Sequence, residues 1–288
     1  MSVRIISDSG CDMTQLEAQI KDVIILPLKT IIDGKEYLDG ITISPEQFYE
    51  KLEECTQLPS TSQVTYMDFA TAYDQVAADD NEAVVITVAG ALSGTLNSAI
   101  LALEDYRDRI HIVDSGSVCI GQRILLEYAL RLREQGLSAA AIAAELEQMK
   151  PRICVIARLD TLEYLMRGGR ISRTAGITGT MLGIKPVLGI ENGEIKMLGK
   201  ARGSKKSNNI LNEIVREKGG IDFSLPYMLA YSGTDDALLK GYIENSRELW
   251  SHYTSELPIS IVGSTIGTHA GPGAIAVAFF APVSAGQS

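Results

Sequence analysis

The strongest constraint on the fold is the alternation of short apolar stretches with helical patterns in the first half of the chain. Strands are predicted at residues 3–7, 24–28, 83–88 and 109–113, with helices between most of them. Residues 83–88 are almost entirely apolar, which is typical of a strand that is covered on both faces. Strands that alternate with helices favour a largely parallel sheet with flanking helices. We therefore predict an N-terminal α/β domain over residues 1–152.

The second half of the chain has a different pattern. A strand at 154–159 leads to a short helix, and residues 187–200 have the alternation of a hairpin. The Asn192-Gly193 pair at its centre favours a type I′ turn. Because this hairpin stands beside further helices and strands, we predict a C-terminal α+β domain over residues 153–288, with a mixed or antiparallel sheet.

The composition excludes several classes of protein. The chain has 26 basic and 36 acidic residues, a formal net charge of −10, so no global positive field attracts nucleic acid. No apolar run reaches the ~20 residues that a membrane-spanning helix needs. The amino end carries Arg4, Asp8 and Asp12 where a signal peptide would be apolar. We expect a cytoplasmic protein with no membrane span and no nucleic-acid partner.

Motifs for cofactors and metals are absent from the sequence. It contains neither a G-x-x-x-x-G-K-[ST] phosphate loop nor a Rossmann fingerprint. The four cysteines have no C-x-x-C spacing, and three histidines are too few for a histidine-rich metal centre. We therefore expect no cofactor and no metal.

Three consecutive hydroxyl side chains precede a predicted helix at Ser60, Thr61 and Ser62. Helix capping would use one or two of them. A helix amino end with spare hydroxyls can also bind a carboxylate or a phosphate. From the residues alone, both interpretations stay open.

Ser93 stands between an apolar strand and a helix, which is the setting of the α/β-hydrolase nucleophile elbow. That motif, G-x-S-x-G, needs glycine where Ala91 and Thr95 stand. We therefore favour Ser93 as a hydrogen-bond donor to an anion. A serine hydrolase of acyl esters, with Ser93 as nucleophile and His269 as base, is the alternative hypothesis.

His269 and an arginine group are further candidates for an anion site. His269 lies in a Gly-rich stretch, residues 267–273, which we predict to be a loop between apolar strands. Arg167, Arg170 and Arg173 surround a Gly-Gly turn, where they either complement a helix end or bind a carboxylate. Purely structural roles are the alternative for both.

In their order and spacing, these motifs resemble the DegV family of bacterial fatty-acid-binding proteins over essentially the whole chain. Each matching stretch is weak alone, but the set is specific. The stretches are Ser7-Asp8-Ser9, Asp33-Gly-Lys-Glu-Tyr37 with Asp39-Gly40, Thr61-Ser62-Gln63, Leu92-Ser93-Gly94-Thr95, Asp114-Ser115, Thr161-Leu-Glu-Tyr-Leu165, Gly168-Gly169-Arg170-Ile171, Lys185-Pro186 and Gly267-Thr268-His269 through Gly273.

The resemblance implies two α/β domains with a long-chain fatty acid bound between them. It implies that Thr61 and Ser93 hold the carboxylate and that four more residues lie close to the head group: Ser62, Gly94, Arg170 and His269. It also implies a partner, because some family members present the bound acid to a separate ATP-dependent fatty acid kinase.

The tail of such a ligand needs an apolar wall, and we predict one in the weakly aromatic segment 177–188. The alternative for this segment is ordinary core. The predicted tail-lining residues are Ile177, Met181, Leu182, Ile184 and Val187.

The leading hypothesis is a lipid-binding carrier without catalysis of its own. A third class, a binding module for a sugar phosphate or a dihydroxyacetone-type ligand, depends only on the polar loops at the carboxyl ends of the predicted strands.

Overall fold

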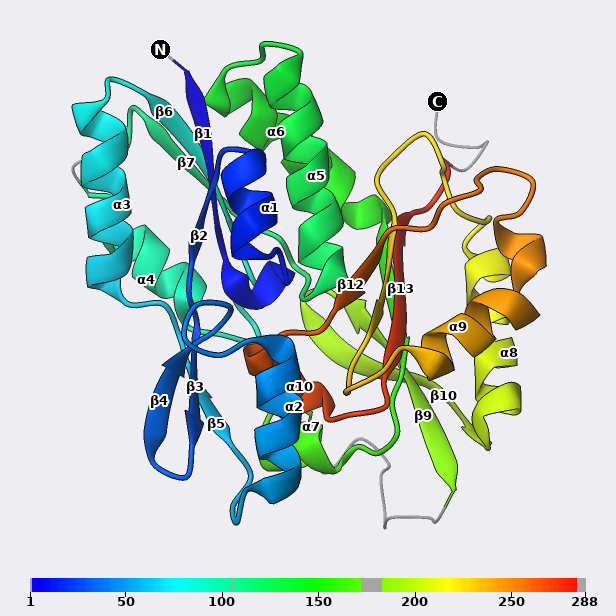
Figure 1. Ribbon diagram of the computed structural model, residues 1–288. Helices are drawn as coiled ribbons and strands as arrows, with labels where there is room; N and C mark the ends of the chain where they lie inside the picture. Colours follow the sequence, from blue (N-terminus) through cyan, green and yellow to red (C-terminus); the bar gives the residue numbers. More distant parts are fainter. Residues whose placement is uncertain (1, 105, 172–182, 284–288) are drawn as a thin grey trace.

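The computed structural model describes residues 2–104, 106–171 and 183–283 (Figure 1). The strands of one large sheet all lie before residue 115, and those of the other all lie after residue 152. Each half of the chain therefore supplies its own large sheet. The division into two domains at residue 152 stays a prediction.

The first sheet is parallel throughout, as predicted, with strand order β2-β1-β6-β7. Its strands are β1 (Val3–Asp8), β2 (Val23–Leu26), β6 (Glu82–Thr87) and β7 (Ile110–Asp114). One face is covered by α3 (Tyr66–Ala78) and α4 (Thr95–Leu101), and the other by α1 (Gln15–Ile20), α5 (Ile120–Glu134) and α6 (Ala139–Met149). Successive side chains of β1 point to opposite faces, so Ile5 packs with α5 and α6 whereas Ile6 packs with α3 and α4.

The second sheet is mixed, with strand order β10-β9-β8-β13-β11-β12. Only β11 and β12 pair in parallel among the described strands of this sheet. The strands are β8 (Ile153–Arg158), β9 (Ile184–Glu191), β10 (Glu194–Arg202), β11 (Met228–Tyr231), β12 (Ile259–Ile261) and β13 (Ile275–Phe280). The predicted hairpin is confirmed as β9 and β10, and Asn192 and Gly193 both have the positive φ of a type I′ turn.

Helices cover both faces of the second sheet. The outer face packs against α8 (Ser204–Glu217) and α9 (Ala237–Asn245), whereas the inner face packs against α5, which it shares with the first sheet (Figure 1). Along β13, Val277 points to the outer core and Ala278 to the core around α5. The α5 helix therefore lies between the two sheets. The described residues also include three short 3-10 helices: η1 (Ser9–Cys11), η2 (Lys150–Arg152) and η3 (Arg247–Leu249).

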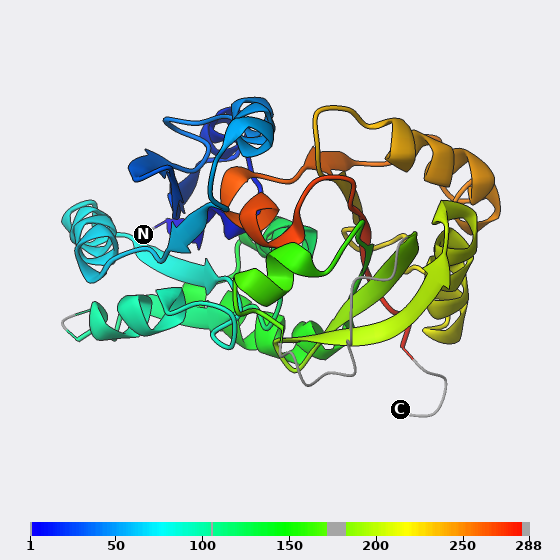
Figure 2. The same cartoon turned by 90° about the horizontal axis from the view of Figure 1, so that it is seen from below.

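A small antiparallel sheet, absent from the sequence prediction, stands beside the first sheet. It has the order β4-β3-β5, with β3 (Lys29–Ile32), β4 (Lys35–Leu38) and β5 (Ser60–Ser62). It adjoins α2 (Pro45–Glu54), which begins with the predicted capping box of Ser44 and Gln47. Two short helices, α7 (Glu163–Arg167) and α10 (Ser264–Ala270), lie in the centre of the molecule, between its two halves (Figure 2).

The α10 helix corrects the prediction of a loop at residues 267–273. His269 lies in the last turn of this helix, and the loop begins only at Gly271. Gly267 is a helical residue, and Phe48 and Tyr49 approach it so closely that a Cβ would lie 2.7 Å from an atom of each. The glycine therefore serves close packing, which sequence alone does not distinguish from a turn.

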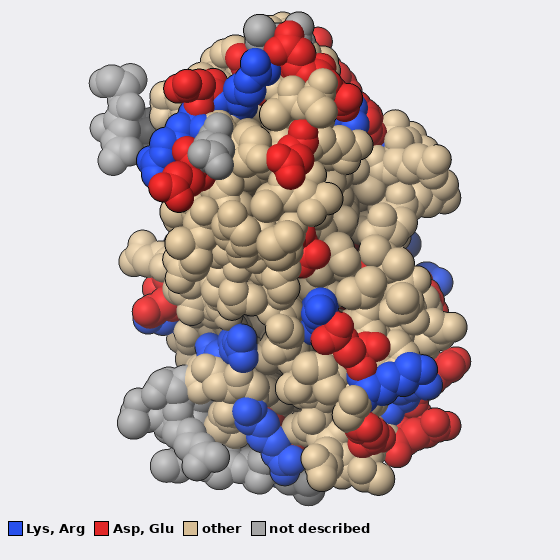
Figure 3. Space-filling view, turned by 90° about the vertical axis from the view of Figure 1, so that its left-hand side faces the viewer, with Lys and Arg blue, Asp and Glu red and all other residues tan. Residues whose placement is uncertain are grey.

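Charged side chains of both signs are distributed over the surface. On the side shown in Figure 3, acidic and basic side chains are interspersed toward the two ends, and a broad band between them has few charges. Among the described residues on this face, no extended surface carries charges of one sign only. Within the described ranges, no helix has the length and apolar character needed to cross a membrane.

Candidate functional site

A cavity of about 370 Å³ is lined by residues from both halves of the chain. Small-molecule sites commonly have volumes of roughly 300 to 1,000 Å³. Val88 and Val118 come from the first half, whereas Val155 and Ala276 come from the second sheet. A ligand in this cavity would therefore touch both halves at once.

The strand β5 and the helix α10 build the polar end of the cavity. Thr61 is the central residue of β5, and its Oγ1 lies 2.9 Å from Nε2 of His269. The strand is fixed by its pairing with β3, in which Thr61 lies opposite Thr30. Capping of α3 does not use this hydroxyl, because Thr65 Oγ1 accepts from the N–H of Asp68 at the start of that helix. The capping interpretation of Thr61 is therefore wrong, and its side chain lines the cavity.

Ser93 adds a second hydroxyl from the turn between β6 and α4. Its Oγ accepts a hydrogen bond from the backbone N–H of Thr95 at 3.2 Å and lies 2.9 Å from Thr95 Oγ1. The neighbouring Gly94 has no room for a side chain, since a Cβ there would lie 2.0 Å from Oε1 of Gln63. The glycine thus allows Gln63, which also lines the cavity, to approach the Ser93 turn.

Arg170 supplies positive charge at this end. Its Nη1 donates to the carbonyl of Gly168 at 2.7 Å, and its Nε donates to the carbonyl of Leu92 at 3.2 Å. In the ranges that the structure describes, Arg170 takes part in no ion pair with Asp or Glu. The guanidinium therefore favours an anion in the cavity.

His269 is neutral at neutral pH. Burial and the charge of Arg170 lower the pKa of the imidazole to about 4. Its Nδ1 is buried and accepts or donates no hydrogen bond among the described residues, and a Cβ on Gly168 would lie 2.2 Å from this atom. A neutral ring can donate its Nε2–H to Thr61, which leaves the threonine's own proton for a ligand oxygen.

The structure brings together all of the residues predicted at the head group. Although Thr61 and His269 are 208 positions apart in the chain, their side chains are hydrogen-bonded. The predicted residues that line this one cavity are Thr61, Ser62, Ser93, Gly94, Arg170 and His269.

The rest of the wall is mainly aliphatic and comes largely from the second half of the chain. Small side chains leave the space open at Ala157 and Ala276, which are direct neighbours on β8 and β13. Sequence reasoning missed this part of the wall, because an apolar strand residue that lines a cavity has the same pattern as one that fills a core. The aliphatic residues of this sheet and its flanks that line the cavity are Val155, Ala157, Leu159, Leu165, Leu188, Ile190, Ile195, Val262, Ile266, Ala270, Ala274 and Ala276.

The tail-lining prediction is corrected at two positions. Neither Ile184 nor Val187 lines the cavity, and Val187 is fully buried in the outer core with residues of α8 and α9. Side chains alternate along β9, so Leu188, the neighbour of Val187, faces the cavity instead, and so does Ile190. Ile184 shares the face of Leu188 but stands at the start of the strand, away from the residues that line the cavity. The other predicted residues, Ile177, Met181 and Leu182, lie outside the described residues.

Comparison with known proteins agrees with this architecture. A family model described as "Uncharacterised protein, DegV family" matches residues 2–282. The chain belongs to the DegV family. A DegV domain-containing protein of Caldanaerobacter subterraneus subsp. tengcongensis is 33% identical over 284 residues, which are 96% of this chain and 98% of the relative.

Two solved DegV-fold structures are also similar. The first, described as fatty acid binding, is a DegV family protein from Thermus thermophilus with 30% identity and a TM-score of 0.87, covering 97% of this chain and 100% of its own. The second is the fatty acid kinase (Fak) B3 protein of Streptococcus pneumoniae loaded with linoleic acid, with 23% identity and a TM-score of 0.83, covering 98% of this chain and 100% of its own. The predicted fold class, with a parallel and a mixed sheet, is confirmed.

The site of this DegV family chain does not support the serine hydrolase alternative. Both Ser93 and His269 line the cavity, but Ser93 Oγ is bonded to Thr95 and His269 Nε2 to Thr61. The other ring nitrogen of His269 meets no carboxylate among the described residues. A catalytic triad needs a serine bonded to the histidine and a third group that orients the ring.

Proposed function

We propose that this protein binds a long-chain fatty acid, with the carboxylate at the polar end of the cavity and the tail along its aliphatic wall. The observation that carries the proposal is that the hydroxyls of Thr61 and Ser93 open into a cavity whose wall is mostly aliphatic. The Thermus relative, which is described as fatty acid binding, supports the ligand class.

The tail supplies most of the binding free energy in this proposal. Burial of ~14 methylene groups at ~0.8 kcal/mol each contributes about 11 kcal/mol before the costs of association are subtracted. The wall is suited to such a chain, because Val155, Ala157 and Ala276 present no polar side-chain atoms to it.

The carboxylate is held by directional hydrogen bonds. A buried charge without partners is expensive to desolvate. With the His269 proton on Nε2, Thr61 accepts from the ring, and Ser93 accepts from the N–H of Thr95, so each hydroxyl can donate its own proton to a carboxylate oxygen. Arg170, without an acidic partner among the described residues, adds favourable charge.

We propose further that the bound acid is presented to a separate ATP-dependent fatty acid kinase, which phosphorylates the carboxylate. The support is the likeness in fold to a Streptococcus pneumoniae protein whose name places it in a fatty acid kinase. Two hydroxyls and one arginine need not enclose both carboxylate oxygens, so one oxygen can stay available for transfer.

Native mass spectrometry of the purified protein tests the ligand. The complex is expected to carry the added mass of one fatty acid, and solvent extraction is expected to release that acid. Stripped protein is expected to rebind hexadecanoic acid. A protein that purifies without ligand and also fails to bind hexadecanoic acid would overturn the proposal.

Trapping with hydroxylamine tests the kinase step, because an acyl phosphate reacts with it to give a hydroxamate. Loaded protein mixed with a bacterial fatty acid kinase and ATP is expected to yield the hydroxamate, and loaded protein without the kinase is not. Hydroxamate formed equally with and without the kinase would contradict a carrier role.

A further inference from the structure

We propose that Asp39 is a positioning residue: by fixing the amino end of α10, it sets the contact between His269 and Thr61 at the polar end of the cavity. Asp39 lies in the connection between β4 and α2 and does not line the cavity. Its effect on ligand binding rests on the proposed function, whereas its effect on the geometry of His269 does not.

The side chain of Asp39 is buried, with 3% of its surface exposed, and makes three hydrogen bonds. Oδ1 accepts from the backbone N–H of Ser264 at 2.8 Å and from the Ser264 hydroxyl at 2.7 Å. Oδ2 accepts from the hydroxyl of Ser9 at 2.8 Å. The Asp39 carboxylate, which accepts all three of these hydrogen bonds, therefore joins η1 in the first half of the chain to the first residue of α10 in the second half.

The amino end of α10 has no side-chain cap of its own and relies on this carboxylate. Its N-cap residue is Gly263, and the first backbone N–H groups of a helix lack partners inside the helix. A Cβ on Gly263 would lie 2.9 Å from Oδ1 of Asp12 and 3.1 Å from Oδ1 of Asp39. The glycine therefore lets two carboxylates from the first half reach the start of the helix.

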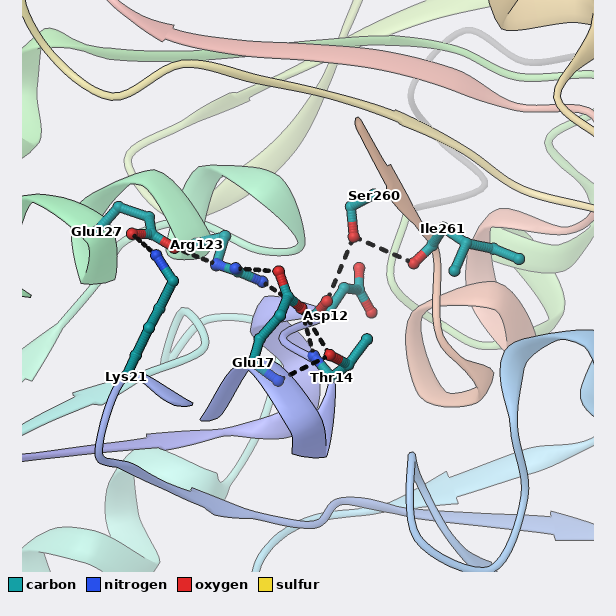
Figure 4. Close-up of polar contacts among 8 residues, drawn as sticks. All are labelled: Asp12, Thr14, Glu17, Lys21, Arg123, Glu127, Ser260 and Ile261. Atoms are coloured by element: carbon teal, nitrogen blue, oxygen red, sulfur yellow. Dashed lines mark hydrogen bonds and ion pairs between the residues drawn. The ribbon is translucent and has the colours of Figure 1, made fainter. Parts of the chain in front are cut away.

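Asp12 is the weaker of these two anchors. Its Oδ1 accepts from the N–H of Gly263 at 2.9 Å, but its Oδ2 is buried without a hydrogen-bond partner in the described ranges. Figure 4 shows that its backbone carbonyl faces the hydroxyl of Ser260, while Arg123 is engaged by Glu17 and Glu127. Asp39, with both oxygens bonded, is the residue that fixes α10 more tightly.

The two ends of α10 are tied to the same small sheet. At the first end, Ser264 Oγ lies 2.9 Å from Oγ1 of Thr30 on β3. Thr30 is the register partner of Thr61 on β5, and Thr61 bonds to His269 at the last turn of α10. Asp39, Ser264 and Thr30 therefore fix one end of a helix whose other end meets the ligand-binding threonine.

The short helix α10 connects these two ends as a rigid element. The helix has seven residues, a length of roughly 10 Å at ~1.5 Å per residue. A hydrogen bond weakens steeply as its distance and angle depart from the optimum. We therefore expect a small tilt of α10 at Ser264 to weaken the contact of His269 with Thr61.

The geometric part of the proposal is tested by NMR of the imidazole nitrogens in ligand-free protein. The chain has three histidines, and His269→Gln identifies the signal of interest. Asp39→Asn keeps the size of the side chain but replaces one acceptor oxygen by an NH2 group. We expect it to shift the His269 nitrogen signals, because the bond to Thr61 is lost.

Asp8→Asn is the matched control. Asp8 is also buried and also accepts hydrogen bonds at both carboxylate oxygens, from the backbone N–H groups of Gly10 and Val88, but it does not bond to α10. Both variants are expected to lower the unfolding temperature, and only Asp39→Asn is expected to move the His269 signals. Unchanged signals in folded Asp39→Asn would overturn the proposal. If that variant does not fold, Ser264→Ala, which loses the hydroxyl contacts with Asp39 and Thr30 but keeps the backbone N–H bond to Asp39, must shift the signals in the same direction.

The functional part is tested by a double-mutant cycle on hexadecanoic acid binding. Asp39→Asn is expected to weaken binding about tenfold, the typical size for a lost hydrogen bond to a charged group. In the His269→Gln background the same change is expected to have no further effect, and independent, additive losses would refute positioning through His269. Wild-type protein that binds no hexadecanoic acid would refute the proposed function, while the NMR comparison would still decide the geometric claim.

Discussion

The two ends of the cavity differ in how they are built. The polar end uses a few residues in β5, just before α4, just after α7 and in the last turn of α10, each placed by specific hydrogen bonds. The aliphatic wall is made by many apolar side chains from β8, β9, β13 and the segments around them. The comparison indicates that specificity for the carboxylate is concentrated in few groups, whereas affinity for the tail is spread over many.

The energetics of the two ends should differ in the same way. Each hydrogen bond to a charged group contributes about 1.5 to 3 kcal/mol, and it acts only on ligands that carry the charge. Each methylene contributes ~0.8 kcal/mol, and it acts on any alkyl chain of sufficient length. Substitutions at the polar end should therefore affect only charged ligands, whereas substitutions in the wall should affect charged and uncharged alkyl ligands alike.

The largest effect on affinity is expected from a bulky side chain that fills part of the cavity beside the aliphatic wall. Ala276 faces the cavity from β13, and Ala276→Phe would occupy space along the tail. Loss of ~4 buried methylenes amounts to about 3 kcal/mol, or roughly a hundredfold weaker binding of hexadecanoic acid. Calorimetric titration measures this loss, and octanoic acid should be affected much less. Equal weakening of both acids would contradict the placement of the tail along β13.

The next largest effect is expected at the polar end. Thr61→Ala and Ser93→Ala should each weaken fatty acid binding by about 1 to 3 kcal/mol, because each removes a donor to a charged group. Fluorescence competition measures the change. Binding of hexadecanol, which carries no charge, should change far less.

Thr71→Ala is the control for these two variants. Thr71 is exposed on α3 and bonds only to the carbonyl of Met67, so its loss should leave binding unchanged. Unchanged affinity in both Thr61→Ala and Ser93→Ala would show that the carboxylate lies elsewhere.

A smaller effect separates two neighbouring residues of β9. Leu188 lines the cavity, whereas Val187 packs in the outer core. Leu188→Ala should weaken binding of hexadecanoic acid by about 1 kcal/mol through lost apolar contact. Val187→Ala should instead lower the free energy of unfolding by about 1 to 3 kcal/mol and leave affinity nearly unchanged. If Val187→Ala weakens binding and Leu188→Ala does not, the tail lies on the Val187 face of β9, which would contradict the account.

The smallest expected effect is the dependence of affinity on pH. The pKa of His269 is about 4 in the free protein, and a carboxylate beside the ring would raise it. As the pH falls from 7 toward 5, the complex then takes up a proton that the free protein does not, so binding strengthens modestly. This strengthening should be absent in His269→Gln. If the affinity of the wild-type protein instead falls between pH 7 and pH 5 relative to that of His269→Gln, the carboxylate does not lie beside His269.

The parallel sheet and the hairpin were predictable because their signals are local. Residues 83–88 read as a doubly covered strand, and Asn192-Gly193 has the turn chemistry that the hairpin uses. The small sheet and α10 were missed because tertiary contacts decide them. Gly267 suggests a loop in the sequence, but it lies in α10, where Phe48 and Tyr49 leave no room for a Cβ.

The candidate site was predictable at its polar end and not along its wall. Hydroxyl, histidine and arginine side chains in short motifs stand out in an aliphatic sequence, and the resemblance to a family joined them. Val187 and Leu188 are both apolar and adjacent, and only the register of β9 in the sheet decides which one faces the cavity. Register depends on pairing between distant segments, which the local pattern does not contain.

The claim that a fatty acid lies with its carboxylate on Thr61 and Ser93 is tested most directly by a crystal structure with hexadecanoic acid. We predict carboxylate oxygens within hydrogen-bond distance of Thr61 Oγ1 and Ser93 Oγ, and a tail in contact with Ala157 and Ala276. An acid bound in the opposite direction, or outside this cavity, would contradict the account.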